Sequence, residues 1–376
     1  MTKKNILTIF LLFSFSILFS QQNDTIYGKV KKIREKVIFL TQKENPQLLY
    51  NDDYGHSGFM GPESTISKFH NTWYTSDLCY YINYERDFDE KGRIVKDIWY
   101  TKKDSFMDSF KYKYNKKDRL VRKIDSSKYA VTTETHYYNN YEDENIIYEN
   151  IEYGFFSHIY KKYKDGKVIH SKKYNEDGTV DEYIYHYNNK EKLSYRIYKN
   201  PNKWKKISER SWSYGVQDSV GTIYKDLINE YDDNNRIIKT QTYDLYEDDD
   251  NHENPVLTDQ TIYKYKGDKI STINKFYSSG KSTFYNFIYD KENRLIEKYC
   301  CDENISNAII IEKYNYKGNK IISLDYSEES FPTNEIKNHK IKFEYINDDY
   351  GNWVEMIKKV NGVDLYKWIR KIEYYQ

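Results

Sequence analysis

The chain has 376 residues, with 59 lysine and arginine residues against 58 aspartate and glutamate residues, so its formal net charge is +1 at pH 7. Such a balance argues against a dedicated nucleic-acid-binding protein, because phosphate contacts need a basic surplus on at least one face. Forty-three tyrosines, 17 phenylalanines and six tryptophans make 18% of the chain aromatic, which excludes a disordered composition because disorder goes with few aromatic residues.

Residues 1–20 have the features of a secretory signal peptide. Lys3 and Lys4 precede a largely apolar run from Ile6 to Phe19, and this run is too short to span a bilayer comfortably. We expect cleavage after Ser20, with an uncleaved N-terminal anchor as the alternative. The sequence therefore predicts an exported protein of the periplasm, the cell surface or the extracellular space, with no membrane span after signal cleavage.

Residues 21–83 form a segment without the pattern that fills the rest of the chain. Residues 26–40 alternate enough to be one or two strands, whereas 51–76 contain three glycines and a proline and read as a long loop. We expect 21–83 to be an N-terminal capping segment that shields the edge of the first repeat, as repeat arrays need. A separate functional domain is the alternative.

Residues 84–376 repeat one short pattern, at a period of roughly 22–26 residues. Each copy has an aromatic residue, Asp or Asn, polar residues, a turn-permissive residue, a base and then Ile, Leu or Val. The long copies are 88–94, 114–120, 187–193, 231–237 and 289–295, and the short copies are 163–168, 265–270 and 316–321. A degenerate copy starts at Tyr141 and a longer one at Tyr345.

The loop residues of each copy predict a tight β-hairpin turn. The short copies contain Asp165-Gly166, Gly267-Asp268 and Gly318-Asn319, and such pairs tolerate the two positive φ angles of a type I′ turn. The long copies place Gly92, Asp118, Asn235 or Asn293 where a type I turn closes with a left-handed residue. Glu191 fits that position poorly.

The residues that flank the turns alternate as β-strands do. Aromatic side chains lie on one face and mostly Lys, His or Glu on the other, as in Phe110, Tyr112 and Tyr114. The sequence predicts an all-β fold, an antiparallel β-hairpin repeat array or meander. Because a long sheet with one wet tyrosine face would bury too little apolar area, we expect a curled or solenoid-like sheet.

The Tyr-Asp-x-x-Gly-Arg-Leu hairpin, with a Tyr-x-Tyr strand before it, resembles the YD repeats of RHS-type bacterial surface proteins. The resemblance covers roughly Tyr84 to Tyr375 and includes the closing segment from Tyr350, which is similar to the end of small exported YD-repeat proteins of unassigned function. In large RHS proteins such repeats form a shell around a C-terminal toxin. This chain ends on a repeat-like strand, so the resemblance implies the architecture without toxin delivery.

Motifs that carry chemistry are few. None of the eight histidines belongs to an HExxH or zinc-ligand spacing, and no Walker A, G-x-S-x-G or GxGxxG motif occurs. The acidic run 247–253 holds residue types that calcium prefers but lacks EF-hand spacing, so a solvated loop is the simpler interpretation. Cys79, Cys300 and Cys301 are too few for a disulfide framework; a bridge from Cys79 to Cys300 or Cys301 and three thiols are the alternatives.

The sequence thus predicts no catalytic, cofactor-binding or metal site, no cofactor and no nucleic-acid partner. We expect a non-enzymatic exported repeat protein that presents an extended surface to a protein or polysaccharide. A polysaccharide-active enzyme with carboxylates in the concave face of the sheet and a purely structural envelope component are the alternatives. Seven aromatic residues are either platforms for a ligand or, as we favour, part of the aromatic core; they are Trp73, Tyr74, Trp99, Trp204, Trp212, Trp353 and Trp368.

Overall fold

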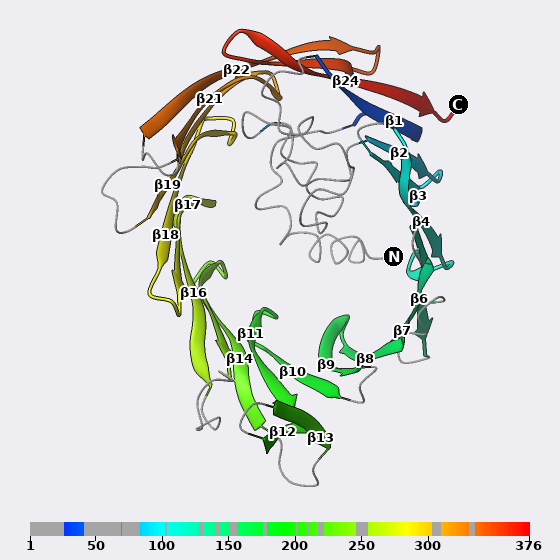
Figure 1. Cartoon of the computed structure of the whole chain (residues 1–376), viewed down its shortest axis with the longest axis vertical. Helices are drawn as coiled ribbons and strands as arrows, with labels where there is room; N and C mark the ends of the chain where they lie inside the picture. Colours follow the sequence, from blue (N-terminus) through cyan, green and yellow to red (C-terminus); the bar gives the residue numbers. More distant parts are fainter. Residues whose placement is uncertain are drawn as a thin grey trace. The chain divides into compact units, whose positions relative to one another are not determined.

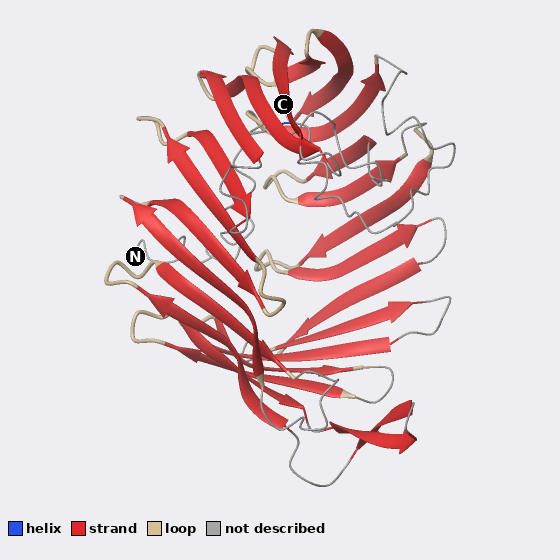
Figure 2. Cartoon of the chain, turned by 60° about the vertical axis from the view of Figure 1, so that its left-hand side comes forward, coloured by secondary structure: helices blue, strands red, loops and turns tan. Residues whose placement is uncertain are grey.

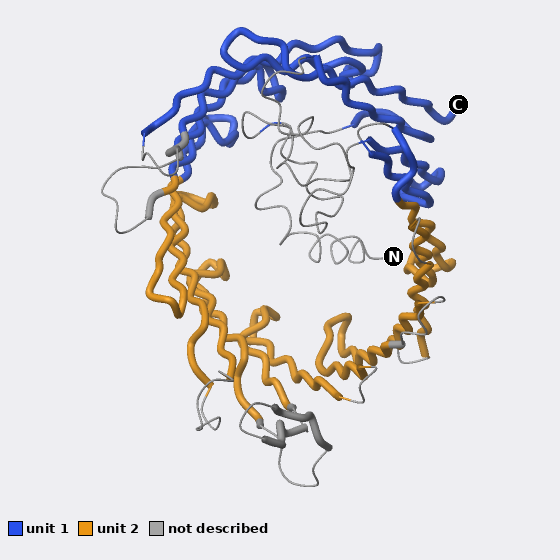
Figure 3. Tube along the Cα trace, viewed as in Figure 1, with its two compact units in different colours: residues 1–107, 287–299, 308–376 blue, residues 108–286, 300–307 orange. Residues whose placement is uncertain are grey.

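The computed structural model describes residues 26–40, 69, 83–101, 104–127, 131–139, 143–150, 156–175, 179–200, 202–208, 211–216, 222–245, 255–302, 310–330 and 335–376. The predicted signal peptide, the acidic run 247–253 and Cys79 lie outside these residues. Two compact units divide the chain (Figure 3): unit 1 comprises 1–107, 287–299 and 308–376, and unit 2 comprises 108–286 and 300–307.

The described residues form 24 β-strands (Figure 2). Unit 1 holds β1 (Val30–Phe39), β2 (Asn83–Phe88), β3 (Ile94–Tyr100), β20 (Ile310–Lys317), β21 (Lys320–Ser330), β22 (Glu335–Asn347), β23 (Trp353–Val360) and β24 (Val363–Tyr374). Three strands contain a unit boundary: β4 (Phe106–Tyr114), β18 (Ser282–Tyr289) and β19 (Leu295–Asp302).

Unit 2 holds the middle strands of the chain. They are β5 (Leu120–Ser127), β6 (Val131–Tyr138), β7 (Glu144–Asn150), β8 (Phe156–Lys164), β9 (Lys167–Tyr174), β10 (Val180–Tyr187), β11 (Leu193–Asn200), β12 (Asn202–Ser208), β13 (Ser211–Val216), β14 (Thr222–Tyr231), β15 (Ile237–Asp244), β16 (Val256–Lys266) and β17 (Lys269–Tyr277). β12 and β13 form a separate two-stranded sheet, and β11 pairs directly with β14.

Sequential strands pair in antiparallel hairpins, for example β8 with β9 and β20 with β21. This confirms the all-β, antiparallel hairpin fold predicted from the alternating pattern. We call the side of the sheet that carries the tyrosine of each turn copy the motif face. On β22 the pattern is clear, since Ile341 and Phe343 are buried on the motif face while Lys342 and Glu344 are exposed on the other.

A β-bulge lies beside most of the repeated turn copies and changes the alternation. In the first hairpin Phe88 pairs with Ile94, whereas Asp87 pairs with Lys96, so one residue of β3 has no partner. Ile94 and Trp99 are five residues apart and would lie on opposite faces of a regular strand, but the bulge places both on the motif face. The same shift recurs beside the turns of β4–β5, β8–β9, β10–β11, β14–β15, β16–β17, β20–β21 and β22–β23.

The turn conformations follow the sequence with one correction. Gly92, Asp118, Asn235 and Asn293 have the predicted positive φ, and so does Glu191 at 66°. Asp165 and Gly166 both have positive φ, as a type I′ turn requires.

Gly267 and Gly318 form a different two-residue turn. Each has positive φ, while the residue after it does not. These turns are therefore of the type II′ class, because a glycine at the first central position is enough to reverse the chain.

The degenerate copy also starts at another residue than predicted. The Asn139 amide donates to the Asp143 carbonyl at 3.0 Å, as the Asp89 amide does to the Arg93 carbonyl in a regular copy. Tyr138, and not Tyr141, therefore has the position of the motif tyrosine.

Unit 1 joins the beginning of the chain to its end. β1 pairs with β2 on one side, where Glu35 lies opposite Tyr84, and with β24 on the other, where Glu35 lies opposite Arg370 (Figure 1). The prediction of a curled or solenoid-like array is wrong at this point, because such an array ends in two edge strands. Here β1 lies between β2 and β24, so it pairs with both strands and satisfies backbone groups that would otherwise lie at open edges.

A buried apolar cluster lies on the motif face of unit 1. It includes Leu324, Met356, Tyr366 and Trp368, which are each completely buried. Phe69 from the 21–83 segment packs on it, with its ring centroid 5.7 Å from that of Phe343. The described residue Phe69 thus contributes to this buried cluster of unit 1.

Candidate functional site

The second residue of each turn copy organises the turn. In the copy at 231–237 the Asp232 carboxylate accepts hydrogen bonds from the Arg236 amide at 2.9 Å and from its Nε at 2.8 Å. The same arrangement occurs for Asp89 with Arg93 and for Asp290 with Arg294. The Asp-to-base spacing of the motif is therefore explained by turn formation rather than by catalysis.

The motif tyrosines link each hairpin to the one before it. The Tyr265 hydroxyl donates to the Ile237 carbonyl at 2.7 Å, and the Arg236 guanidinium lies 4.5 Å from the centroid of the Tyr265 ring. Equivalent hydroxyl bonds run from Tyr138 to Leu120, Tyr187 to Val168, Tyr231 to Leu193, Tyr316 to Leu295 and Tyr345 to Ile321. Tyrosine is needed here because phenylalanine would leave a half-buried carbonyl without its donor.

Many tyrosines on the motif face of unit 2 are only half-buried, although Tyr224 on the same face is 8% exposed. Tyr163, Tyr183, Tyr185 and Tyr263 all keep partial exposure. Charged groups lie among them, such as the Arg196 guanidinium, 4.5 Å from the Tyr183 ring centroid. The described residues of unit 2 thus form a sheet face that is lined by tyrosines and charged side chains.

A charged cluster occupies this face on β6 and β7. The His136 ring lies between two carboxylates, with Nδ1 2.6 Å from Glu144 and Nε2 2.8 Å from Glu134. Tyr138 and Tyr163 donate their hydroxyls to Glu144, each at 2.9 Å. Strand alternation places Glu134, His136 and Tyr138 on one face, and the turn places Glu144 beside Tyr138.

The protonation states in this cluster do not suit acid catalysis. Burial by itself lowers the pKa of His136, but the two carboxylates outweigh it and raise this pKa to about 9. Burial raises the pKa of Glu144, whereas the bonds from His136 and Tyr138 lower it to about 2. At neutral pH the cluster is an imidazolium between two carboxylates, so neither carboxyl group holds a proton for a leaving group.

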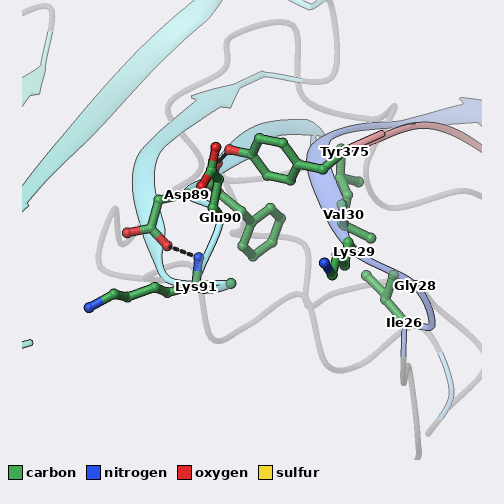
Figure 4. Close-up of a pocket in the computed structure, with 11 residues that line it drawn as sticks. Ile26, Gly28, Lys29, Val30, Asp89, Glu90, Lys91 and Tyr375 are labelled. Carbon is green, nitrogen blue, oxygen red and sulfur yellow. Dashed lines mark hydrogen bonds between the residues drawn. The ribbon is translucent and has the colours of Figure 1, made fainter.

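An open cleft of about 430 Å³ lies in unit 1, between the start of β1, the first turn and the chain end (Figure 4). Val30, Ile33 and Phe88 give it an apolar floor, and Lys29 and Glu90 stand at its rim. The Tyr375 hydroxyl donates to the Phe88 carbonyl at 2.6 Å.

The same part of unit 1 buries an ion pair. Arg370 and Glu35 are 2.6 Å apart and nearly inaccessible to water. The Arg370 guanidinium also lies 3.6 Å from the Trp353 ring centroid. The pair fastens β1 to β24 and is not open to a ligand.

The residues singled out in the sequence fall mainly into structural positions. Trp99, Trp353 and Trp368 are 1%, 5% and 0% exposed and belong to the core, so they are not ligand platforms. Trp73, Tyr74 and the side chains of Trp204 and Trp212 lie outside what the structure describes. His186 lies on the face opposite the motif tyrosines, where it is half-buried and its ring centroid lies 4.3 Å from that of Tyr195. The Cys300 thiol contacts Tyr285.

Sequence reasoning missed the cluster around His136. Its residues carry no motif, and the available signal was only the alternation of Glu134, His136 and Tyr138 along one strand. Among the described residues, no group of three or more His, Cys, Asp or Glu side chains could hold a metal ion. In the same residues no helix is long and apolar enough to cross a membrane.

The fold and the site define an all-β protein of antiparallel hairpin repeats with a tyrosine-rich sheet face. No protein-family model matches the chain, and no curated protein matches it. Among solved structures it is similar to the Photorhabdus luminescens Tc holotoxin pore, with 10% identity, a TM-score of 0.32 and coverage of 77% of this chain and 19% of that one.

Two further solved structures are similar at the same low level. The TcdB2-TccC3-Cdc42 complex has 9% identity, a TM-score of 0.24 and coverage of 76% of this chain and 19% of that one. A porin-like protein from Bacteroides vulgatus has 12% identity, a TM-score of 0.25 and coverage of 71% of this chain and 94% of that one. The chain thus spans about a fifth of the two toxin chains, and these comparisons name no family for it.

Proposed function

We propose that the protein is an exported, non-enzymatic YD-repeat protein that binds a macromolecule in the bacterial envelope or outside the cell through the motif face of unit 2. The half-burial of Tyr163, Tyr183, Tyr185 and Tyr263 carries this proposal. Aromatic rings with partial exposure and polar neighbours supply contact area at low entropic cost, as in many binding surfaces. Unit 1 buries its motif face and supplies stability instead.

A polysaccharide-active enzyme is the second candidate, because Glu134 and Glu144 lie on either side of one imidazole. Paired carboxylates are the usual apparatus of glycoside hydrolysis. Their low pKa values count against this candidate. A purely structural envelope component is the third.

The test is retention of the chain 21–376 on immobilised polysaccharides and on envelope proteins, with product release assayed in the same tubes. Tyr185→Leu and Tyr263→Leu alter the motif face, and Tyr137→Leu is the matched control because Tyr137 is 56% exposed on the opposite face. Retention that falls at least fivefold in the two motif-face variants and not in the control supports the proposal.

Released sugars would establish the enzyme in place of the binding protein. Unchanged retention in all three variants, or no retention of the natural chain by any macromolecule, would refute binding through this face. The third candidate, a structural component, would then remain.

A further inference from the structure

The motif face of five neighbouring strands in unit 2, β10, β11, β14, β15 and β16, carries an excess of acid. The aspartates on it, which we call the acidic strip, are Asp181, Asp226, Asp244 and Asp259. Two basic side chains lie among these strands on this face. One is Arg196 on β11, and the other is Arg236 from the turn between β14 and β15, whose guanidinium lies 4.5 Å from the Tyr265 ring centroid and binds Asp232. The two strands that flank this group each add a lysine to the motif face. Lys173 on β9 lies opposite Asp181, and Lys275 lies on β17.

Three of these carboxylates keep capacity for a cation. Within the described part of the chain, Asp181, Asp244 and Asp259 have no lysine or arginine at ion-pair distance, and Asp244 and Asp259 are exposed. Tyr198 donates its hydroxyl to Asp181 at 2.8 Å, and Tyr224 donates to Asp244 at 3.1 Å. Asp181 also accepts from the Asn175 side-chain amide at 3.1 Å, and Asp244 also accepts from the Leu245 backbone amide at 2.8 Å. Two such bonds leave about half of the acceptor sites of a carboxylate open.

Arg196 shows how this face holds an arginine. Its guanidinium lies 4.5 Å from the Tyr183 ring centroid, and its Nε donates to Asp226 at 2.9 Å. A planar guanidinium is suited to both contacts at once, whereas an ammonium lacks the fork that matches a carboxylate. Tyr198 with Asp181 offers the same ring and carboxylate chemistry. Tyr224 beside Asp244 is 8% exposed, so there the exposed Asp244 carboxylate alone is offered.

The strip also has the length of a short peptide. Five adjacent strands at about 4.8 Å spacing span about 20 Å, and an extended chain advances about 3.3 Å per residue, so about six residues cross the strip. We propose that the acidic strip docks an extended arginine-rich segment of a partner protein. This proposal rests on the proposed function, since it names the partner chemistry of the same face.

The experiment uses the chain 21–376 and fluorescein-labelled hexa-arginine, with fluorescence anisotropy as the readout. Asp181→Asn, Asp244→Asn and Asp259→Asn are combined in one variant, because asparagine keeps the shape and removes the charge. The control removes three exposed carboxylates at turns elsewhere, with Asp268→Asn, Glu292→Gln and Asp349→Asn. Both variants change the net charge equally, and circular dichroism verifies that each is folded.

We expect the strip variant to weaken hexa-arginine binding at least tenfold and the control variant less than twofold. We also expect hexalysine to bind more weakly than hexa-arginine. Equal losses in the two variants would mean non-specific charge attraction and would overturn the proposal, as would an absence of hexa-arginine binding at 50 mM salt. If the chain still retains a neutral polysaccharide through Tyr185 and Tyr263, the proposed function stands and the arginine-rich partner alone is refuted.

Discussion

Replacing Lys358 with methionine tests how unit 1 tolerates a lysine in its core. Lys358 is completely buried, with its ammonium nitrogen 6.0 Å from the Phe343 ring centroid. Burial lowers its pKa from the ordinary 10.5 to about 7. Since one pKa unit is worth about 1.4 kcal/mol, burying the charged form costs about 5 kcal/mol.

The pH dependence of this cost gives the prediction its sign. Below pH 7 the lysine is protonated in both the folded and the unfolded state, so its contribution is constant. Between pH 7 and 10.5 the unfolded state binds more protons, and the free energy of unfolding rises with pH by up to about 1.4 kcal/mol per unit. Lys358→Met, which keeps the length of the side chain, should raise the free energy of unfolding by about 4 kcal/mol at pH 7.

Urea denaturation followed by tryptophan fluorescence at pH 7 and pH 9 is the assay, because Trp353 and Trp368 lie in the same core. Between these pH values the difference in unfolding free energy between Lys358→Met and the natural chain should shrink by about 2 kcal/mol. Lys342→Met is the control, since Lys342 is exposed on the opposite face. A difference that does not change with pH, or a Lys358→Met chain less stable than the natural one, would refute the reasoning.

Four further predictions concern single side chains. Tyr265→Phe removes one hydroxyl bond to a carbonyl and should lower the free energy of unfolding of unit 2 by about 1 kcal/mol in urea denaturation. Glu35→Gln leaves the Arg370 charge buried without its partner and should cost about 3–5 kcal/mol, measured in the same way for unit 1. Because the pKa of His136 is raised in the folded state, protonation of His136 stabilises the fold fully below pH 6.5, and this stabilisation is lost as the pH rises through about 9. His136→Gln should therefore be less stable than the natural chain at pH 6, and the difference should vanish by pH 10, as measured by thermal denaturation. Glu191→Asn should stabilise unit 2 by about 1 kcal/mol, since asparagine tolerates the positive φ better than glutamate.

Matched controls separate these effects from general surface changes. Tyr350→Phe alters a tyrosine that is 55% exposed and should change stability by less than about 0.5 kcal/mol. Glu355→Gln breaks a half-exposed pair with Lys367 and should cost less than about 1 kcal/mol. The structural account would be contradicted if Tyr265→Phe and Glu35→Gln lowered the free energy of unfolding no more than their controls do. A pH-independent effect of His136→Gln, or a loss of stability in Glu191→Asn, would also contradict it.

Local chemistry made the hairpins predictable. Alternation of Phe110, Tyr112 and Tyr114 identified a half-buried strand, and residues such as Gly92 and Asn235 marked the turns because few residues accept positive φ. These are properties of neighbouring residues, so a single sequence is enough to reveal them. The turn at Asn361-Gly362, where both residues have positive φ, had an equally strong signal and was missed because it lies outside the repeated pattern.

Tertiary structure decided which long-range contacts form. The pairing of β1 with β24 joins residues such as Glu35 and Arg370, which are 335 positions apart, and no local pattern specifies it. The bulges likewise moved Trp99 to the motif face against simple alternation, and the cluster around His136 formed because a turn brought Glu144 beside it. The sequence by itself determined the strands and turns through short-range sterics and hydrogen bonding, whereas burial and charge pairing between distant strands depend on register and could be seen only in the folded chain.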